Sequence, residues 1–169
     1  MKVWNYLYYG TWALLNYLAK VLIERPIEKL FNSNPSLSKK WKEGKSSYKE
    51  FTYSSEASIN VSYSYGIMIV TTTLICGMCC ILLIIPFDKN IDTNLKYYFI
   101  GIFLVSYLIN YKLLWYRETY KKHFKIFEKK NMGLTSMVSA GLFHLIVLLL
   151  FALCLFLWHD FLIDIWLKL

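Results

Sequence analysis

The chain has 169 residues, of which 57% are hydrophobic and 18% are charged, and its formal net charge is +8. Soluble domains usually hold about 45–50% apolar residues and about 25% charged residues, so this composition argues against an ordinary soluble domain. The apolar residues also cluster in stretches long enough to cross a bilayer, and most basic residues flank these stretches. The pattern predicts an integral membrane protein, with the lipid bilayer as its first partner and nucleic acid as an unexpected one.

The N-terminal apolar segment, residues 1–23, carries one narrow polar stripe. At roughly 100° per residue, a helix places five polar residues on one side: Lys2, Asn5, Tyr9, Asn16 and Lys20. If the helix spans the membrane, the stripe faces a bundle interior, another subunit or a water-filled path. If the helix lies in the interface, the stripe faces lipid headgroups. The narrow stripe favours a span, and Asn5, Asn16 and Lys20 are our candidate pore-lining or interhelical residues.

Residues 24–64 form a polar, basic connection that holds seven of the 19 Lys and Arg residues. Near its end, over residues 56–65, apolar and polar side chains alternate with a period of two, which is typical of a β-strand. We therefore expect a short hairpin, or a strand that pairs between subunits. The alternative is an extended lead into the next helix, capped by Ser62 or Ser64.

Residues 65–87 are predicted to form the central transmembrane helix, because no charge interrupts residues 65–85. Such a stretch makes a helix of about 32 Å, close to the ~30 Å hydrocarbon core of a bilayer. Small and hydroxylated residues on one side would let another helix approach closely: Gly66, Thr73, Gly77 and Cys80. The cysteines at 76–80 and Cys154 lie in apolar stretches, where ionising a thiol is unfavourable. We expect them to pack rather than to bind metal.

A short external loop, residues 88–96, leads to a second predicted span, residues 97–115. Asn110 lies on this span and is expected to hydrogen-bond to another helix. Residues 116–134 are predicted to continue the helix into the cytoplasm as a basic amphipathic helix that ends in a turn. One side of this helix is our candidate surface for a protein partner or for anionic lipid headgroups: Tyr116, Tyr120, Phe124, Phe127, Lys121 and Lys125.

The third predicted span is residues 135–159. Ser136, Ala140 and His144 recur at intervals of four and so share one face of a helix. Ser136 and Ala140 are candidate packing residues, and His144 is a candidate pore or interhelical polar residue. In the remaining residues, 160–169, the charged residues Asp160, Asp164 and Lys168 recur at intervals of four among apolar ones, which indicates an interfacial segment.

The distribution of basic residues predicts the topology. The connections 24–64 and 116–134 together hold 13 of the 19 Lys and Arg residues, so both are expected in the cytoplasm by the positive-inside rule. A bacterial inner membrane, or another membrane that faces the cytoplasm, fits this bias. If residues 1–23 span, both termini lie outside; otherwise the N-terminus lies inside.

These patterns predict an all-α integral membrane protein with three transmembrane helices plus the N-terminal apolar helix, and with no cofactor. Intramembrane enzymes need several acids, bases or metal ligands at one depth, and no predicted span contains Asp or Glu, so an enzyme is not expected. The expected function is a non-enzymatic membrane subunit that associates with itself or with another membrane protein and presents a basic cytoplasmic face. The alternative is a homo-oligomeric pore or permeability effector, whose path is lined by the polar stripe of the N-terminal helix.

Overall fold

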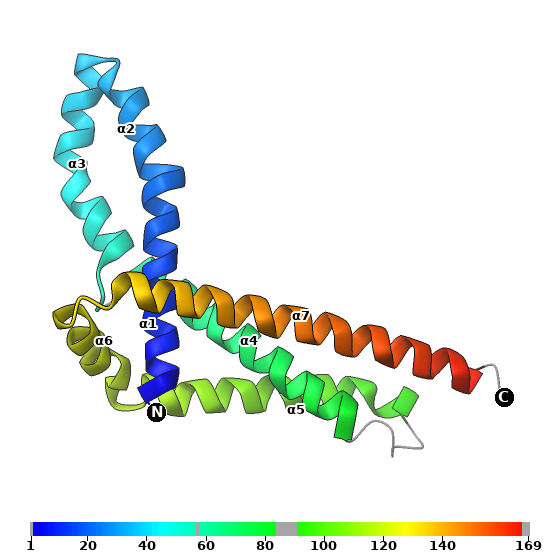
Figure 1. Ribbon diagram of the computed structural model, residues 1–169. Helices are drawn as coiled ribbons and strands as arrows, with labels where there is room; N and C mark the ends of the chain where they lie inside the picture. Colours follow the sequence, from blue (N-terminus) through cyan, green and yellow to red (C-terminus); the bar gives the residue numbers. More distant parts are fainter. Residues whose placement is uncertain (1, 57, 84–90, 167–169) are drawn as a thin grey trace. The chain divides into compact units, whose positions relative to one another are not determined.

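The computed structural model describes residues 2–56, 58–83 and 91–166, with side chains described except at 83, 91–95 and 160–166. Every regular element in these residues is a helix, which confirms the predicted all-α fold class (Figure 1). The chain divides into two compact units. Unit 1 comprises Met1–Ile67 and Leu113–Gly141, and unit 2 comprises Met68–Lys112 and Leu142–Leu169.

Unit 1 begins with a long helical rod. Three elements follow one another without a break in helical geometry: α1 (Lys2–Ala19), the π-helical turn η1 (Lys20–Glu24) and α2 (Arg25–Asn32). Pro26 lies in the first turn of α2, and in a regular α-helix its ring would clash with the carbonyl group four residues earlier. The wider π turn directly before it makes room for the ring. The rod therefore continues past residue 23, where we expected the helix to end.

The next helix, α3 (Pro35–Tyr53), folds back along the rod, so that the two make an antiparallel helical hairpin (Figure 1). Asn34 caps α3, because its side chain accepts a hydrogen bond from the N–H of Ser36 at 3.0 Å. The rings of Phe31 and Trp41 pack across the hairpin with centroids 5.7 Å apart. Most of the predicted basic loop is therefore helical.

The predicted strand over 56–65 is wrong, because none of its described residues is in a strand. Helix α4 (Ile59–Leu83) begins instead directly after Ser58. The Ser58 hydroxyl accepts a hydrogen bond from the N–H of Val61 at 3.4 Å, so the capping residue is neither Ser62 nor Ser64.

The alternation over 56–65 failed as a signal because polar side chains lie on the buried face of α4. Asn60, Val61 and Ser64 are all buried, and they are spaced as neighbours on a helix. The Ser64 hydroxyl donates to the carbonyl of Asn60 at 2.6 Å, which satisfies it within the helix. Burying a hydroxyl that hydrogen-bonds to its own helix backbone costs little free energy, so polar residues do not identify the solvent-exposed face of this helix.

The predicted amphipathic helix within 116–134 is present as α6 (Thr119–Lys129), but it does not continue the second span without a break. Three elements precede it: α5 (Ile91–Asn110), the π-helical turn η3 (Tyr111–Trp115) and the 3₁₀ turn η4 (Tyr116–Glu118). Arg117 and Glu118 have φ values of 54° and 53°, in the left-handed region that non-glycine residues rarely adopt. These two residues break the helix, so α6 is a separate element that packs by its own contacts.

The last helix, α7 (Gly133–Trp166), is continuous over 34 residues and so runs beyond the predicted end of the third span at residue 159. The predicted interfacial segment 160–169 is thus helical as far as Trp166, and residues 167–169 lie outside the described part of the chain. Likewise, α5 begins at Ile91, inside the predicted loop 88–96, and residues 84–90 lie outside the description.

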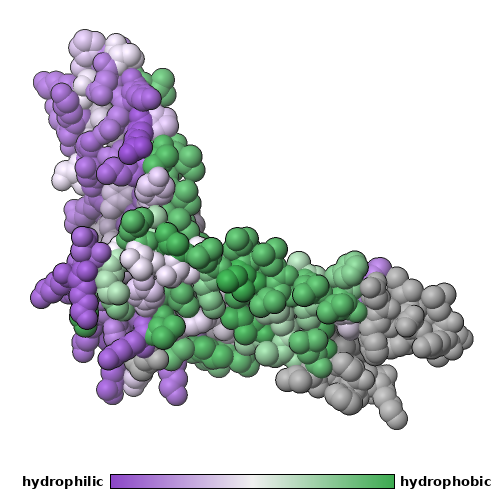
Figure 2. Space-filling view, viewed as in Figure 1, coloured by the Kyte–Doolittle hydropathy of each residue, from purple (hydrophilic) through white to green (hydrophobic). Residues whose placement is uncertain are grey.

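Three described stretches are long and apolar enough to cross a membrane: Ile59–Leu82, Lys96–Lys129 and Gly133–His159. They confirm the three predicted transmembrane helices, and they make the chain an integral, multi-pass membrane protein in architecture. Within the residues searched, α1 does not meet the same length and hydropathy criteria. Figure 2 shows hydrophobic side chains over the apolar helices and hydrophilic side chains over the α2–α3 hairpin.

Candidate functional site

The candidate functional region of unit 1 is its group of polar and amphipathic helices. We call α1, η1, α2, α3 and α6 the head, and we call the unit 2 parts of α4, α5 and α7 the bundle.

An aromatic contact between α1 and α6 forms the centre of the head. Phe124 is fully buried, and its ring lies 5.1 to 5.3 Å, centroid to centroid, from the rings of Tyr8, Tyr9 and Trp12. Tyr120 is also buried, and its hydroxyl donates to the carbonyl of Glu56 at 2.8 Å. Rings at these separations add stabilisation beyond the area they bury. The head therefore has an aromatic core of its own.

This contact changes the meaning of the predicted partner surface on residues 116–127. Phe127 packs on Tyr6 at 5.6 Å, and Phe124 and Tyr120 face α1, so these three aromatic side chains are used inside the chain. Tyr116 is 48% exposed and stays available on the surface. The sequence predicts a protein partner or anionic lipid headgroups on this surface, whereas in unit 1 the aromatic side chains of α6 pack on α1.

The two lysines of the same predicted surface form ion pairs. Lys121 Nζ lies 2.7 Å from Glu118 Oε1, and Lys125 Nζ lies 3.1 Å from Glu56 Oε1. The hydrogen bond from Lys125 lowers the pKa of Glu56. Both pairs are exposed and each stabilises the head only slightly.

A close helix crossing fixes α1 against α7. A Cβ atom built on Gly10 would overlap the carbonyl group of Ser136 and would lie 2.8 Å from the Cβ of Ala140. Ser136 and Ala140 are fully buried, and both were candidate packing residues. Sequence reasoning missed Gly10, although a single glycine inside a helix, between Tyr9 and Thr11, usually has a packing reason.

The polar stripe of α1 is used within unit 1. Asn5 is fully buried, and its Nδ2 donates to the carbonyl of Leu113 at 3.2 Å. Asn16 accepts a hydrogen bond from Asn60 Nδ2 at 2.7 Å. Lys20 is exposed and lines a pocket beside α3. The stripe predicted to line a pore or meet other helices therefore connects α1 to the first turns of α4 and to Leu113.

A buried carboxylate links the rod to α3. Glu24, the last residue of η1, is 4% exposed, and its Oε2 accepts a hydrogen bond from the Tyr53 hydroxyl at 3.0 Å. Its Oε1 lies 3.5 Å from Lys45 Nζ and 3.8 Å from Lys49 Nζ. Burial of the Tyr53 hydroxyl, together with hydrogen bonds to neighbouring groups, raises the pKa of this phenol. Such partners offset the free-energy cost of removing a carboxylate from water.

The pocket next to Glu24 has a volume of about 350 Å³. Its lining combines two cations, one anion and three uncharged polar side chains: Asn16, Tyr17, Lys20, Glu24, Lys49 and Tyr53. One turn further along the hairpin, Lys45 also hydrogen-bonds to Glu28, which lowers the pKa of Glu28 and raises that of Lys45. These charged contacts hold α3 on the rod and leave a small excess of positive charge.

The bundle contains its own polar network. Asn110 on α5 is fully buried and donates to the Thr72 hydroxyl on α4 at 2.8 Å and to the carbonyl of Ser106 at 2.9 Å. His144 on α7 lies 2.8 Å, Nδ1 to Oγ1, from Thr71 on α4. Asn110 and His144 therefore connect α4 to its two neighbours within one chain.

The candidate packing residues of α4 differ in their surroundings. A Cβ atom built on Gly77 would lie 3.4 Å from the Phe151 ring on α7, and Cys80 is buried. The Thr73 hydroxyl donates to the carbonyl of its own helix at Ile69, at 2.9 Å. Nothing lies within 4 Å of a Cβ built on Gly66, so Gly66 makes no close helix contact in unit 1.

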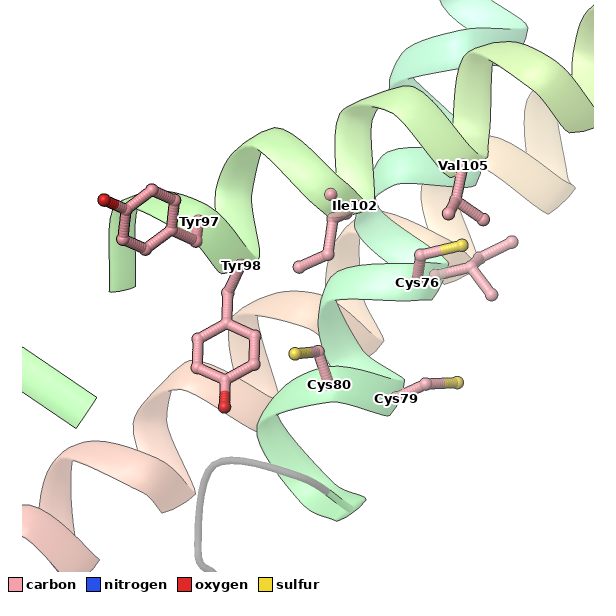
Figure 3. Close-up of a pocket in the computed structure, with 9 residues that line it drawn as sticks. Cys76, Cys79, Cys80, Tyr97, Tyr98, Ile102 and Val105 are labelled. Atoms are coloured by element: carbon pink, nitrogen blue, oxygen red, sulfur yellow. The ribbon is translucent and has the colours of Figure 1, made fainter. Parts of the chain in front are cut away.

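Three cysteines of α4 line an apolar groove of about 400 Å³ between α4 and α5 (Figure 3). Cys76, Cys79 and Cys80 share this groove with Tyr98 and with aliphatic side chains of α5. In the residues that the structure covers, no group of three or more His, Cys, Asp or Glu side chains could hold a metal ion. The groove therefore offers shape and apolar surface rather than ligands.

Comparison with protein families, with curated proteins and with solved structures finds no match for this chain. The case for a function rests on the side chains described above. Two features carry most of it: the packed, basic head, and the internal pairing of polar residues in both units.

Proposed function

We propose that this chain is a non-enzymatic subunit of a membrane assembly, in which three transmembrane helices anchor a basic helical head that faces the cytoplasm. The observation that carries the proposal is the aromatic contact between α1 and α6, because it makes the head a packed structure rather than a loop. A packed domain can present a fixed charged surface to a partner, whereas a flexible loop must first lose conformational entropy.

The surface that would meet a partner is the tip of the hairpin. Lys39, Lys40 and Lys42 are exposed near the start of α3, and none of them forms an ion pair with a described residue. The lysines nearer the head core, Lys45 and Lys49, already face Glu24. The tip therefore carries the unneutralised charge, and it suits an acidic surface on another protein or on a second copy of this chain.

The positive-inside rule supports the cytoplasmic placement of the head. Residues 24–64 and 116–134 contain most of the Lys and Arg residues, and these ranges include all of α2, α3 and α6. The predicted cytoplasmic connections thus contain every helix of the head except α1 and the π-helical turn η1.

The pore remains the alternative function, and it is tested separately. Asn5 and Asn16 would have to exchange their hydrogen bonds to Leu113 and Asn60 for water, which counts against a path lined by α1. The variant Asn16→Leu with Lys20→Leu distinguishes the two proposals in a dye-release assay on reconstituted vesicles. Release by the native chain that is abolished in this double variant would support the pore, and equal behaviour of the two would exclude the stripe as its lining.

The subunit proposal is tested by the composition of the purified particle. The full chain is isolated from its membrane in mild detergent, and the mass and stoichiometry of the particle are measured. We expect a homo-oligomer or a stoichiometric complex, which should be lost when Lys39, Lys40 and Lys42 are all changed to Glu. Changing the same three residues to Arg is the matched control, because it keeps the charge. A monomer without a partner in the native chain would contradict the proposal.

A further inference from the structure

We infer that one face of the α1–α2 rod binds the surface of an anionic phospholipid bilayer. This inference deepens the proposed function and rests on its cytoplasmic placement of the head. The face is the side of the rod turned away from α3, and its occupant is the headgroup layer of the membrane in which the bundle is embedded.

The side of the rod that meets α3 is identified by its contacts. Glu24 hydrogen-bonds to Tyr53, and Phe31 packs on Trp41. Glu28 hydrogen-bonds to Lys45 on the same side. The interior of the hairpin is thus occupied, and any further contact of the rod must use the remaining side.

That remaining side is apolar and open. Leu22 is 67% exposed, Ile23 is 49% exposed and Leu30 is 70% exposed. Leu22 and Leu30 are eight residues apart, which places them close together around the rod and about 12 Å apart along it. Figure 2 shows this hydrophobic edge along the α1–α2 side of the hairpin, next to hydrophilic side chains. Exposed aliphatic residues in a row are costly in water.

Cations follow the same side of the rod. Arg25 and Lys29 continue the helical spacing of Leu18 and Leu22, and both are exposed. Neither forms an ion pair with a described residue. An apolar row beside a basic row is the pattern of a helix that lies in the interface, with aliphatic side chains among the acyl chains and cations at lipid phosphates.

Contacts of α1 lie near the ends of two apolar stretches. Tyr8 donates to the carbonyl of Val61 at 2.9 Å, and Asn5 donates to the carbonyl of Leu113. Val61 lies near the first residue of the candidate span Ile59–Leu82, and Leu113 lies just before the break that precedes α6. These are the ends of the apolar stretches nearest to the basic segments. The rod therefore begins in contact with chain segments that are expected at the lipid headgroups, which favours a bilayer surface over a soluble partner as the occupant of its face.

The test measures the membrane depth of single side chains in the full protein. A nitroxide label is attached at Leu30→Cys, and a reference label at Ser46→Cys, which is exposed on α3. Both use a background in which the four native cysteines are changed to Ala. The protein is reconstituted in nanodiscs of equimolar phosphatidylcholine and phosphatidylglycerol, and collisions with oxygen and with a water-soluble nickel chelate are compared.

We expect the label at position 30 to favour oxygen and the label at position 46 to favour the nickel chelate. In Arg25→Glu with Lys29→Glu, the label at position 30 should lose its oxygen preference. The matched control Lys122→Glu with Lys129→Glu makes the same charge change at two exposed positions of α6 and should leave that preference intact. The preference should also weaken in nanodiscs of phosphatidylcholine alone.

Two outcomes would overturn the inference. The label at position 30 could be as accessible to the nickel chelate as the label at position 46, which would mean that the face is in water. It could be shielded from both reagents, which would mean that protein covers it, either a second copy or a partner. Neither outcome contradicts the subunit proposal, because that proposal depends on the hairpin tip and is measured by the composition of the particle.

Discussion

In the head the largest buried side chains are aromatic, whereas in the bundle several of the fully or nearly fully buried side chains are polar. The buried polar residues of the bundle are Thr71, Thr72, Ser106 and Asn110. In a membrane, lipid competes with apolar packing, and what helices gain from association is close contact and hydrogen bonds. In water, burial of aromatic area supplies the driving force. The head also buries polar residues (Asn5, Thr11, Glu24 and Thr52), so the two interiors differ in their aromatic content rather than in whether they bury polar groups.

The head and the bundle also differ in the side chains that they expose. Aliphatic side chains such as Leu145 and Leu149 of the bundle are more than half exposed, as expected of side chains that face lipid. On the head, exposed charged side chains are interspersed with exposed apolar ones, and the exposed aliphatic side chains of η1 and α2 include Leu22 and Leu30. The hydrophobic edge of the rod thus resembles the membrane-facing surface of the bundle in exposing aliphatic side chains.

The largest expected effect follows from removing the aromatic core of the head. Phe124→Ala should destabilise the head by about 3–5 kcal/mol, because a fully buried ring is replaced by a cavity. Tyr116→Ala, at an exposed position of η4, should cost under about 0.5 kcal/mol. Hydrogen exchange in detergent should show loss of protection in α1 and α6 but not around Asn110. Equal loss in both regions would mean that the head and the bundle unfold as one.

A second variant tests the helix crossing at Gly10. Gly10→Ala should destabilise by about 1–3 kcal/mol or more, since the added methyl group meets the backbone of Ser136, which cannot move aside as a side chain would. Gly44→Ala is the control: nothing lies within 4 Å of a Cβ there, so the higher helix propensity of Ala should stabilise α3 by up to about 1 kcal/mol. Thermal unfolding of both variants gives the sign directly, and a neutral Gly10→Ala would contradict the crossing.

In the bundle, loss of a polar contact should lower the free energy of unfolding by less than loss of the aromatic core of the head does. Asn110→Leu should destabilise by roughly 1 kcal/mol, because the Thr72 hydroxyl still donates to the carbonyl of Met68 at 2.8 Å. The comparison is Leu108→Ala at a lipid-facing position that is 60% exposed, where little change is expected. Denaturant titration in mixed micelles measures both. A loss at Asn110 as large as that at Phe124 would remove the distinction drawn between the two interiors.

The smallest expected effect is a pH dependence of the hairpin. The pKa of Glu28 is lowered by its hydrogen bond from Lys45, so the folded state binds this proton less tightly than the unfolded chain does. The contribution is therefore present above the ordinary glutamate pKa and is lost as pH falls through the lowered value. The raised pKa of Lys45 has the opposite sign: its contribution is lost as pH rises through the raised value.

Hydrogen exchange of α3 as a function of pH measures this dependence. Glu28→Gln should flatten the acid limb, and added salt should weaken it, because both groups are exposed enough to be screened. An unchanged acid limb in Glu28→Gln would assign the dependence to other groups.

Much of the fold could be predicted from composition and period. The uncharged runs at 65–85 and in residues 135–159 required membrane helices, because a charge-free stretch of that length is costly to expose to water. The predicted strand over 56–65 was wrong. Ser64 can be buried because its hydroxyl hydrogen-bonds to the backbone of its own helix, so the alternation of polar and apolar residues does not report which side chains are exposed. The break at Arg117 and Glu118 had no signal, because neither residue favours the left-handed conformation.

For the candidate site too, local features could be predicted from the sequence and long-range contacts could not. Positively charged segments and an aromatic side on α6 are visible in the sequence, because charge and period are local properties. That Phe124 meets Tyr8, more than a hundred residues earlier, is not local. Nor does local sequence indicate that Asn16 accepts a hydrogen bond from Asn60, or that α1 and α7 cross at Gly10.

The sequence by itself determined the class of this protein: an all-α chain with three apolar helices, flanked by basic segments. Only the tertiary structure decided what α1 does. Its polar and aromatic side chains could equally have faced a pore, another subunit or headgroups, because the amphipathic pattern specifies only that this side is covered. Long-range contacts cover that face within the chain. The carbonyl groups of Val61 and Leu113 accept hydrogen bonds from its side chains, and the ring of Phe124 packs on its aromatic rings.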